Sequence, residues 1–267
     1  MGAATWSDRL SPAQVDAMSA PVRALIEANA PFWGAEAEVV RSYFDAPDRG
    51  DRGDLAWLAR QCHKELFDGV LPRLDAAREQ ILLLDDGHSA DVLATTLHEA
   101  WEELDHYRAF AAIYDAVRGP GDAVLTYVTL RDEWAWPENA ELCALRRLHR
   151  QEHGVLGVRA CAFTEGGGAT LYLEGARLEG RRAADATIVK VCERVLDDEV
   201  GHMFAGVADL GATELTTEEW ATLSDLTVAQ LRLRIPMRNA QFGWPVSPER
   251  IAQLQTDGAR PVSYVDR

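Results

Sequence analysis

Two short stretches of the sequence place a glutamate three residues before a histidine. They are Glu103 with His106, in EELDHYRAF, and Glu199 with His202, in DDEVGHMF. Residues three apart lie on one face of a helix, so each pair can bind one metal ion together. A carboxylate oxygen with an imidazole nitrogen suits iron, manganese or zinc rather than calcium or magnesium. The repeated spacing therefore predicts a transition-metal site.

Two further carboxylates stand where such a site would need them. Antiparallel helices joined by a short turn bring residues roughly 30 to 40 positions apart to the same level. Glu65 lies about that far before Glu103, and Glu165 about that far before Glu199. Both lie among apolar or small residues, where a charge is costly unless something compensates it, and a metal pair would do so. Asp68, one turn after Glu65, remains an alternative ligand from the first helix.

The elements that must position these residues are predicted to be helices. Apolar residues recur at spacings of three and four, and Pro and Gly fall mainly between the long segments. No strand pattern is present, so we expect an all-α fold. The pattern predicts four long helices, at residues 55–84 with a kink near Pro72, 90–118, 140–178 and 183–208.

The segments that flank these helices are predicted to be helical as well. Residues 1–54 form an N-terminal helical decoration, 55–208 the four-helix bundle, and 209–267 a C-terminal helical extension that covers the bundle. Thr216 and Glu219 have the spacing of a capping box, which predicts a helix that starts there and ends at Pro236.

This arrangement resembles the ferritin-like di-metal carboxylate superfamily, in its oxygenase and oxidase branch. Bundles of that kind take one Glu from each of two helices and a Glu-x-x-His from each of the other two. The resemblance implies a ferritin-like four-helix bundle. It implies that two metals and the catalytic centre are held by Glu65, Glu103, His106, Glu165, Glu199 and His202. It also implies that Glu102 and Asp198 hydrogen-bond the ligand histidine of the opposite helix, which would fix the imidazole tautomer.

The function implied by this resemblance is that of an O2-activating non-haem di-iron oxygenase or oxidase. Its cofactors would be two iron ions, with a Mn/Fe or Mn pair as alternatives, and O2 would be its co-substrate. Its partners would be a small organic molecule to be hydroxylated, desaturated or N-oxidised, and an external electron donor. The alternative is a ferroxidase, peroxidase or iron-storage protein, whose substrate is the metal or peroxide. The chain has extra segments on both sides of the bundle, and it carries no CxxC motif for a rubredoxin-type iron. Both points favour the first hypothesis.

The composition of the chain limits the kinds of partner and the location that we expect. The chain has 267 residues, 47% of them apolar, which suits a folded protein with a sizeable core. A formal charge of −16 argues against nucleic-acid and anionic-membrane partners, because both are polyanions. The first residues lack a basic region followed by an apolar run, so we expect a cytoplasmic protein with reduced cysteines. A homodimer is expected only from the resemblance to the ferritin-like superfamily.

Three local features carry further expectations. Gly166–Gly168 follow Glu165 and are unfavourable in a helix, by about 1 kcal/mol each relative to Ala. They leave space beside the metals, permit a π-bulge, or allow close helix packing. Arg234 and Arg238 stand next to apolar residues, where they could meet a substrate carboxylate. The aromatic residues expected in the core are Trp57, Trp101 and Tyr172.

Overall fold

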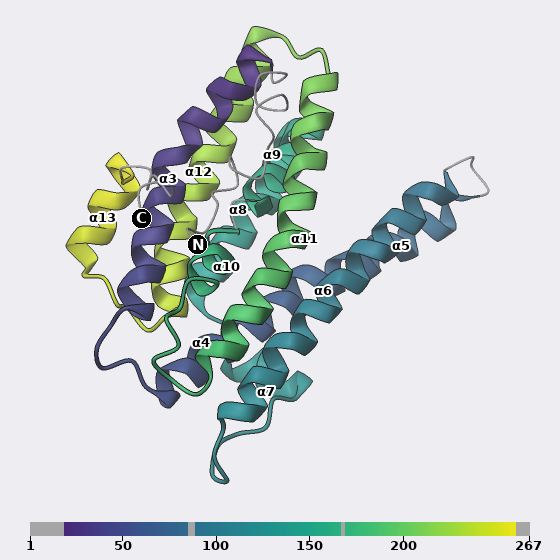
Figure 1. Ribbon diagram of the computed structural model, residues 1–267. Coiled ribbons are helices and arrows are strands. Elements are labelled where there is room, and N and C mark those ends of the chain that lie inside the picture. Colours follow the sequence, from purple (N-terminus) through teal and green to yellow (C-terminus); the bar gives the residue numbers. More distant parts are fainter. Residues whose placement is uncertain (1–18, 85–88, 167–168, 260–267) are drawn as a thin grey trace. The chain divides into compact units, whose positions relative to one another are not determined.

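The computed structural model describes residues 19–84, 89–166 and 169–259; the side chains of 165–166, 200–209 and 211–212 lie outside this description. Every regular element within those ranges is a helix (Figure 1). The all-α prediction is therefore confirmed for the part of the chain that the structure describes. None of these helices combines the length and the hydropathy that crossing a membrane requires.

Contacts divide the chain into two compact units. Unit 1 comprises Met1–Arg49 and Pro137–Arg267, and unit 2 comprises Gly50–Trp136. The N-terminal and C-terminal helices thus belong to the same unit as the second half of the expected bundle. This grouping is based on contacts and differs from the predicted division into 1–54, 55–208 and 209–267. The predicted division concerns the roles of those segments and stays a prediction.

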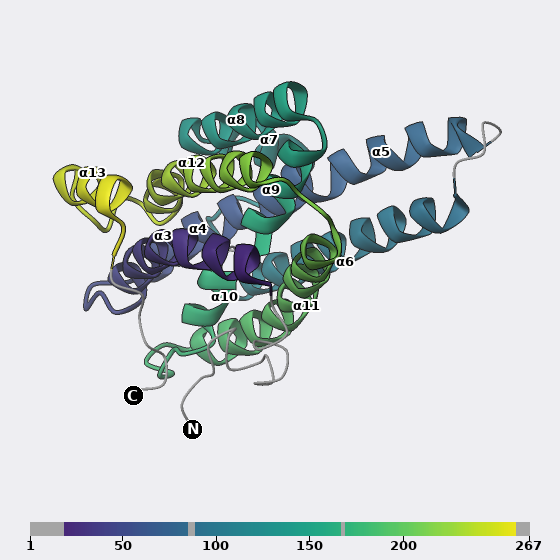
Figure 2. The ribbon, with the colours of Figure 1, turned by 90° about the horizontal axis from the view of Figure 1, so that it is seen from above.

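Unit 2 is built on a long helical hairpin. Three segments follow one another without a break: helix α4 (Asp51–Lys64), the π-helix η1 (Glu65–Val70) and helix α5 (Leu71–Leu82). Helix α6 (Ala90–Val117) returns along all three, and Figure 2 shows α5 and α6 side by side. The short helix α7 (Tyr127–Glu133) packs against α4.

The first helix of the hairpin is distorted just before Pro72. Pro72 has no N–H to donate to the carbonyl of Asp68, four residues earlier, and its ring would clash with that carbonyl in an α-helix. The chain widens into a π-helical turn there, and the Leu71 N–H donates to the Leu66 carbonyl, five residues back. The predicted irregularity exists, but it takes the form of a π-helix that begins at Glu65.

Helix α6 carries its buried residues on one stripe. Ser89 caps the helix as its side chain accepts a hydrogen bond of 3.1 Å from the Asp91 N–H. Buried positions then recur every three or four residues, as expected for a helix with one face in the core. The buried residues of α6 are Ala100, Glu103, His106, Phe110, Ile113 and Tyr114. The motif residues of α6 therefore occupy the stripe on which apolar residues stand at the neighbouring turns.

Two of the three predicted core aromatics are buried. Trp57 packs edge-to-face on Phe110, with ring centroids 6.2 Å apart, and Tyr172 is also buried. The prediction for Trp101 is wrong, because 56% of its surface is exposed. Trp101 follows the buried Ala100 by one residue, which rotates it about 100° away from the core stripe.

Unit 1 is organised around one long helix, α12 (Thr217–Gln241). It packs against the N-terminal helix α3 (Ala20–Phe44) and three others in the described part of the chain. These are α8 (Pro137–His153), α9 (Val155–Gly166) and α13 (Pro248–Asp257). Helix α10 (Ala169–Gly175) and helix α11 (Asp185–Ala212) pack on each other, and both also contact α3.

The single third helix predicted at 140–178 is wrong, since it is interrupted between α8 and α9. The break falls at Gly154, whose φ of +52° lies in the left-handed region that favours glycine. Helix α9 is described up to Gly166 and α10 from Ala169. Gly167 and Gly168 themselves lie outside the described residues.

The predicted start of α12 is confirmed, and its predicted end is wrong. Thr216 and Glu219 form the expected capping box. The helix runs through Pro236 to Gln241 rather than stopping there. Pro236 cannot donate to the carbonyl of Arg232, but the Gln255 side chain of α13 donates to that carbonyl at 3.1 Å. A tertiary contact thus compensates the missing helical hydrogen bond.

We expect Gly154→Ala to lower the free energy of unfolding by about 1 to 2 kcal/mol, because a Cβ is unfavourable at positive φ. No atom lies within 4 Å of the position that the Cβ would take, so backbone strain is the expected cause. Gly121→Ala is a matched control, since its Cβ also meets open space and no positive φ is recorded there. Denaturant unfolding measures both variants, and equal stabilities would contradict the account of this break.

Candidate metal centre

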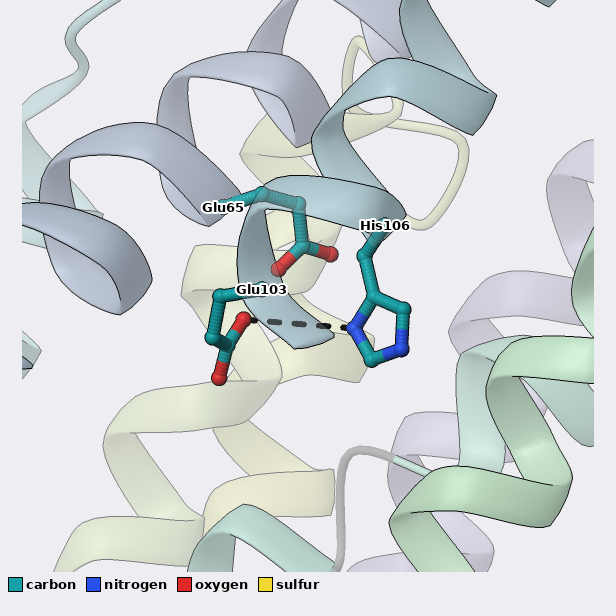
Figure 3. Close-up of side chains that lie close together, drawn as sticks. All are labelled: Glu65, Glu103 and His106. Atoms are coloured by element: carbon teal, nitrogen blue, oxygen red, sulfur yellow. Dashed lines mark ion pairs between the residues drawn. The ribbon is translucent and has the colours of Figure 1, made fainter. Parts of the chain in front are cut away.

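Three of the predicted ligands converge in unit 2. Glu65 comes from η1, and Glu103 and His106 come from α6; Figure 3 shows the three side chains directed toward one another. Glu65 and His106 are each 1% exposed, and Glu103 is 9% exposed. One ligand atom from each residue lies within 4.8 Å of the other two. Asp68, the alternative to Glu65, is partly exposed and is not a member of this cluster.

These distances are close to what one ion requires. Two atoms bound to one ion at about 2.1 Å lie at most about 4.2 Å apart, so small side-chain movements complete the geometry. Glu103 Oε2 and His106 Nδ1 already lie 4.0 Å apart. Two carboxylate oxygens and an imidazole nitrogen are ligands for iron, manganese or zinc. The donor set and spacing therefore fit a transition-metal ion.

The Glu65 carboxylate is oriented and kept ionised by its neighbours. Gln61, one helical turn earlier, donates a hydrogen bond from its amide to Glu65 Oε1. Burial raises the pKa of Glu65, but the combined effect of Lys64, His106 and the Gln61 amide outweighs it. The pKa of Glu65 therefore lies below its ordinary value. Glu65 is therefore in the form that binds a cation.

The two oxygens of Glu103 face different groups. Oε1 lies 3.1 Å from the Arg73 guanidinium, whose Nε also lies 3.4 Å from Glu99. Oε2 is the oxygen that faces His106. Arg73 therefore neutralises part of the carboxylate pair and fixes Glu103 through Oε1, while Oε2 faces His106.

Gly69 leaves room for the Glu103 carboxylate. It lies within η1, and a Cβ at this position would stand 2.6 Å from Glu103 Oε2 and 2.8 Å from its Cδ. Real Cβ atoms do not approach that closely, so the absence of a side chain at Gly69 is what permits Glu103 to lie there.

Cys62 is a buried thiol outside the cluster of Glu65, Glu103 and His106. Burial raises the pKa of the Cys62 thiol well above its ordinary value, and the charges of Glu65 and Asp115 raise it further. These effects favour the neutral thiol. His63 is also accounted for, since its Nδ1 lies 2.8 Å from the Leu130 carbonyl oxygen.

The second motif lies in unit 1 on a comparable stripe. Glu199 is 9% exposed and follows the buried Ile188, Cys192 and Val195 along α11 at spacings of three and four. Glu165 lies in α9 and His202 in α11, and both side chains lie outside the described residues. Glu199, Glu165 and His202 therefore stay predicted ligands.

Glu102 and Asp198 are expected to orient the ligand histidines, and this role stays a prediction. Glu102 is half-buried and lies 3.4 Å from His98 Nε2 on the same helix. Asp198 is half-buried on α11. Their predicted hydrogen bonds to the ligand histidine of the opposite helix stay predictions.

Sequence reasoning missed three residues that shape the cluster: Gln61, Gly69 and Arg73. Gln61 and Gly69 stand four residues before and after Glu65, on the same helical face, so the spacing rule that paired Glu103 with His106 also applies to them. The contact of Arg73 with Glu103 depends on how α5 and α6 pack, and no local signal in the sequence predicts it.

Comparisons of this chain with protein-family models, with curated proteins and with solved structures found no match. The chemistry of the residues described above is therefore the basis for inferring a function, and the resemblance to the ferritin-like superfamily stays a hypothesis.

We expect Gly69→Ala to weaken Fe(II) binding about tenfold or more, the range seen when groups that support metal ligands are lost. The new methyl group displaces the flexible end of Glu103, so the unfolding free energy should change little. Gly119→Ala is the control, because its Cβ would lie 3.5 Å from the Asp122 carboxylate, an ordinary contact. Anaerobic Fe(II) titration measures both, and equal affinities would show that Glu103 is not a ligand.

Proposed function

We propose that this protein is an O2-dependent non-haem di-iron oxygenase or oxidase that acts on a small organic molecule. The observation that supports it most is the buried cluster of Glu65, Glu103 and His106 on core-facing helix positions. Under this proposal these residues hold one half of the centre, and Glu165, Glu199 and His202 supply the other half. The centre and its ferritin-like arrangement are parts of the proposal.

The bound irons would supply the electrons that reduce O2 and thereby produce the oxidant for the substrate. The described residues contribute binding and orientation. Glu65 binds through a carboxylate that Gln61 orients, and Glu103 binds through Oε2, the oxygen that faces His106. The buried setting keeps bulk water away from the cluster, which strengthens the attraction between ligands and metal.

The helices that carry none of the predicted ligands favour an organic substrate over the metal itself. Helices α3, α12 and α13 carry none of the predicted ligands, yet they form a large part of unit 1 and its core. An iron-storage or ferroxidase bundle has no need of such additions, whereas an enzyme can use them to enclose an organic substrate.

The first test of this proposal is the metal content of protein loaded anaerobically with Fe(II), measured by plasma mass spectrometry. We expect about two irons per chain in the wild type, as in other di-metal bundles. Glu65→Ala and Glu199→Ala should each lower the content sharply. Asp68→Asn, a neighbouring carboxylate outside the cluster, should leave it unchanged. A wild-type protein that binds no iron would contradict the proposal.

Oxygen uptake separates the two classes of function. An enzyme for an organic substrate should stop consuming O2 once its bound iron is oxidised, and resume only when a reductant is added. A ferroxidase should consume O2 again with each new portion of Fe(II), because iron is then the substrate. Continued uptake with excess Fe(II) alone would replace the oxygenase proposal by the ferroxidase alternative. Parallel uptake curves for Glu65→Ala, recorded with the same Fe(II) additions, give the contribution of unbound iron.

A further inference from the structure

A turn of α9 is held by a buried arginine of α12. The carbonyl of Thr164, in α9, accepts a hydrogen bond of 3.1 Å from Arg234 Nη1. Thr164 directly precedes Glu165 in the sequence. The contact with Arg234 therefore fixes the backbone of the helical turn to which Glu165 belongs.

Arg234 is itself fixed by a carboxylate from another helix. Its Nε donates to Glu36 Oε2 of α3 at 2.9 Å, and its Nη2 lies 3.4 Å from Glu36 Oε1. Arg238 shares that partner, since its Nε donates to Glu36 Oε1 at 2.8 Å. The carboxylate that both arginines bind is thus Glu36 rather than one from a substrate. The planar guanidinium of Arg234 links α3 to α9 in one rigid arrangement.

The side chain of Thr164 is held as firmly as its carbonyl. Its hydroxyl donates to Gln230 Oε1 at 2.6 Å and accepts from Arg146 Nη2 at 3.2 Å. Gln230 stands four residues before Arg234, on the same face of α12. Thr164 is fully buried, so these contacts are shielded from water. The residue directly before Glu165 is therefore fixed through both its backbone and its hydroxyl.

The charge of Arg234 also acts on the second motif. Burial opposes the charged form, but Glu36 outweighs it and the pKa of Arg234 is raised, with further contributions from Glu199 and Tyr172. Arg234 is thus near enough to Glu199 for their charges to attract. By contrast, burial and the neighbouring Arg234 lower the pKa of Arg238.

We propose that Arg234 is a positioning residue for the metal ligands of unit 1, because it links Glu36 to the turn of α9 that carries Glu165. This inference rests on the proposed function. It extends that function to a residue that touches neither metal nor substrate. Arg238 gives a matched comparison, because it binds the same Glu36 and has no recorded contact with Thr164.

The test compares Arg234→Lys with Arg238→Lys by anaerobic Fe(II) titration of the full chain. Both variants keep the positive charge, and both lose the planar fork at Glu36. We expect Arg234→Lys to weaken one of the two iron sites about tenfold or more, the range for groups that support ligands, and to leave the other unchanged. Arg238→Lys should keep both affinities within about twofold.

Thermal unfolding of the metal-free variants separates positioning from a general loss of structure. A merely structural role would lower the melting temperature and weaken both iron sites together. If Arg234→Lys fails to fold, Glu36→Asp replaces it, since this variant keeps the buried negative charge and shortens the side chain that fixes Arg234. Selective weakening of one site in that variant supports the inference.

The outcomes are distinguishable from failure of the proposed function. A wild type that binds two irons, with equal affinities in Arg234→Lys and Arg238→Lys, overturns the positioning role and leaves the di-iron proposal standing. Wild-type affinity in Glu36→Asp has the same consequence when Arg234→Lys does not fold. A wild type that binds no iron overturns both.

Discussion

Carboxylates buried on the core-facing sides of helices impose the main physical constraint on this fold, because their charges must be compensated. Glu65, Glu103 and Glu199 occupy positions where the neighbouring turns carry apolar residues. Removing an ion from water costs several kcal/mol after relaxation, whereas a poor helix former costs about 1 kcal/mol. Compensation of these charges therefore outweighs local helix preference. Arg73 and His106 supply part of it in unit 2, and a bound cation would supply more.

A local irregularity of the chain falls beside the carboxylates of unit 2. The π-helix begins at Glu65 and contains Gly69, whose missing side chain gives Glu103 its place. A glycine within a helix is unfavourable by roughly 1 kcal/mol. Its coincidence with the predicted ligands is what a site that requires space and fixed geometry would produce. In unit 1, Arg234 binds the carbonyl of Thr164, the residue before Glu165.

How much the sequence predicts depends on whether a feature is local. Helix α6 was predicted nearly to the residue, because Ser89 and the apolar spacing are local signals. The continuation of α12 through Pro236 was not, since it depends on Gln255 from another helix. Trp101 was misplaced because nothing local shows which face of α6 meets the core.

The same division applies to the candidate site. Glu65 was predicted from the geometry of an antiparallel hairpin, and it lies with Glu103 and His106 in the structure. A π-bulge was one of three interpretations of the glycines after Glu165, and Gly167 and Gly168 lie outside the described residues. The described π-helix begins at Glu65, where Pro72 removes a helical hydrogen bond. The contacts of Arg73 and Arg234 join segments far apart in the sequence, so spacing could not predict them.

The proposed function requires that the two Glu-x-x-His motifs bind iron in one dinuclear centre. X-ray absorption spectroscopy of the iron-loaded protein tests this most directly, because it reports the distance between neighbouring metals. The account predicts an iron–iron distance of about 3.5 to 4 Å, typical of two-metal sites. Iron surrounded only by light atoms, with no second metal at that distance, would contradict it and leave two separate sites or one.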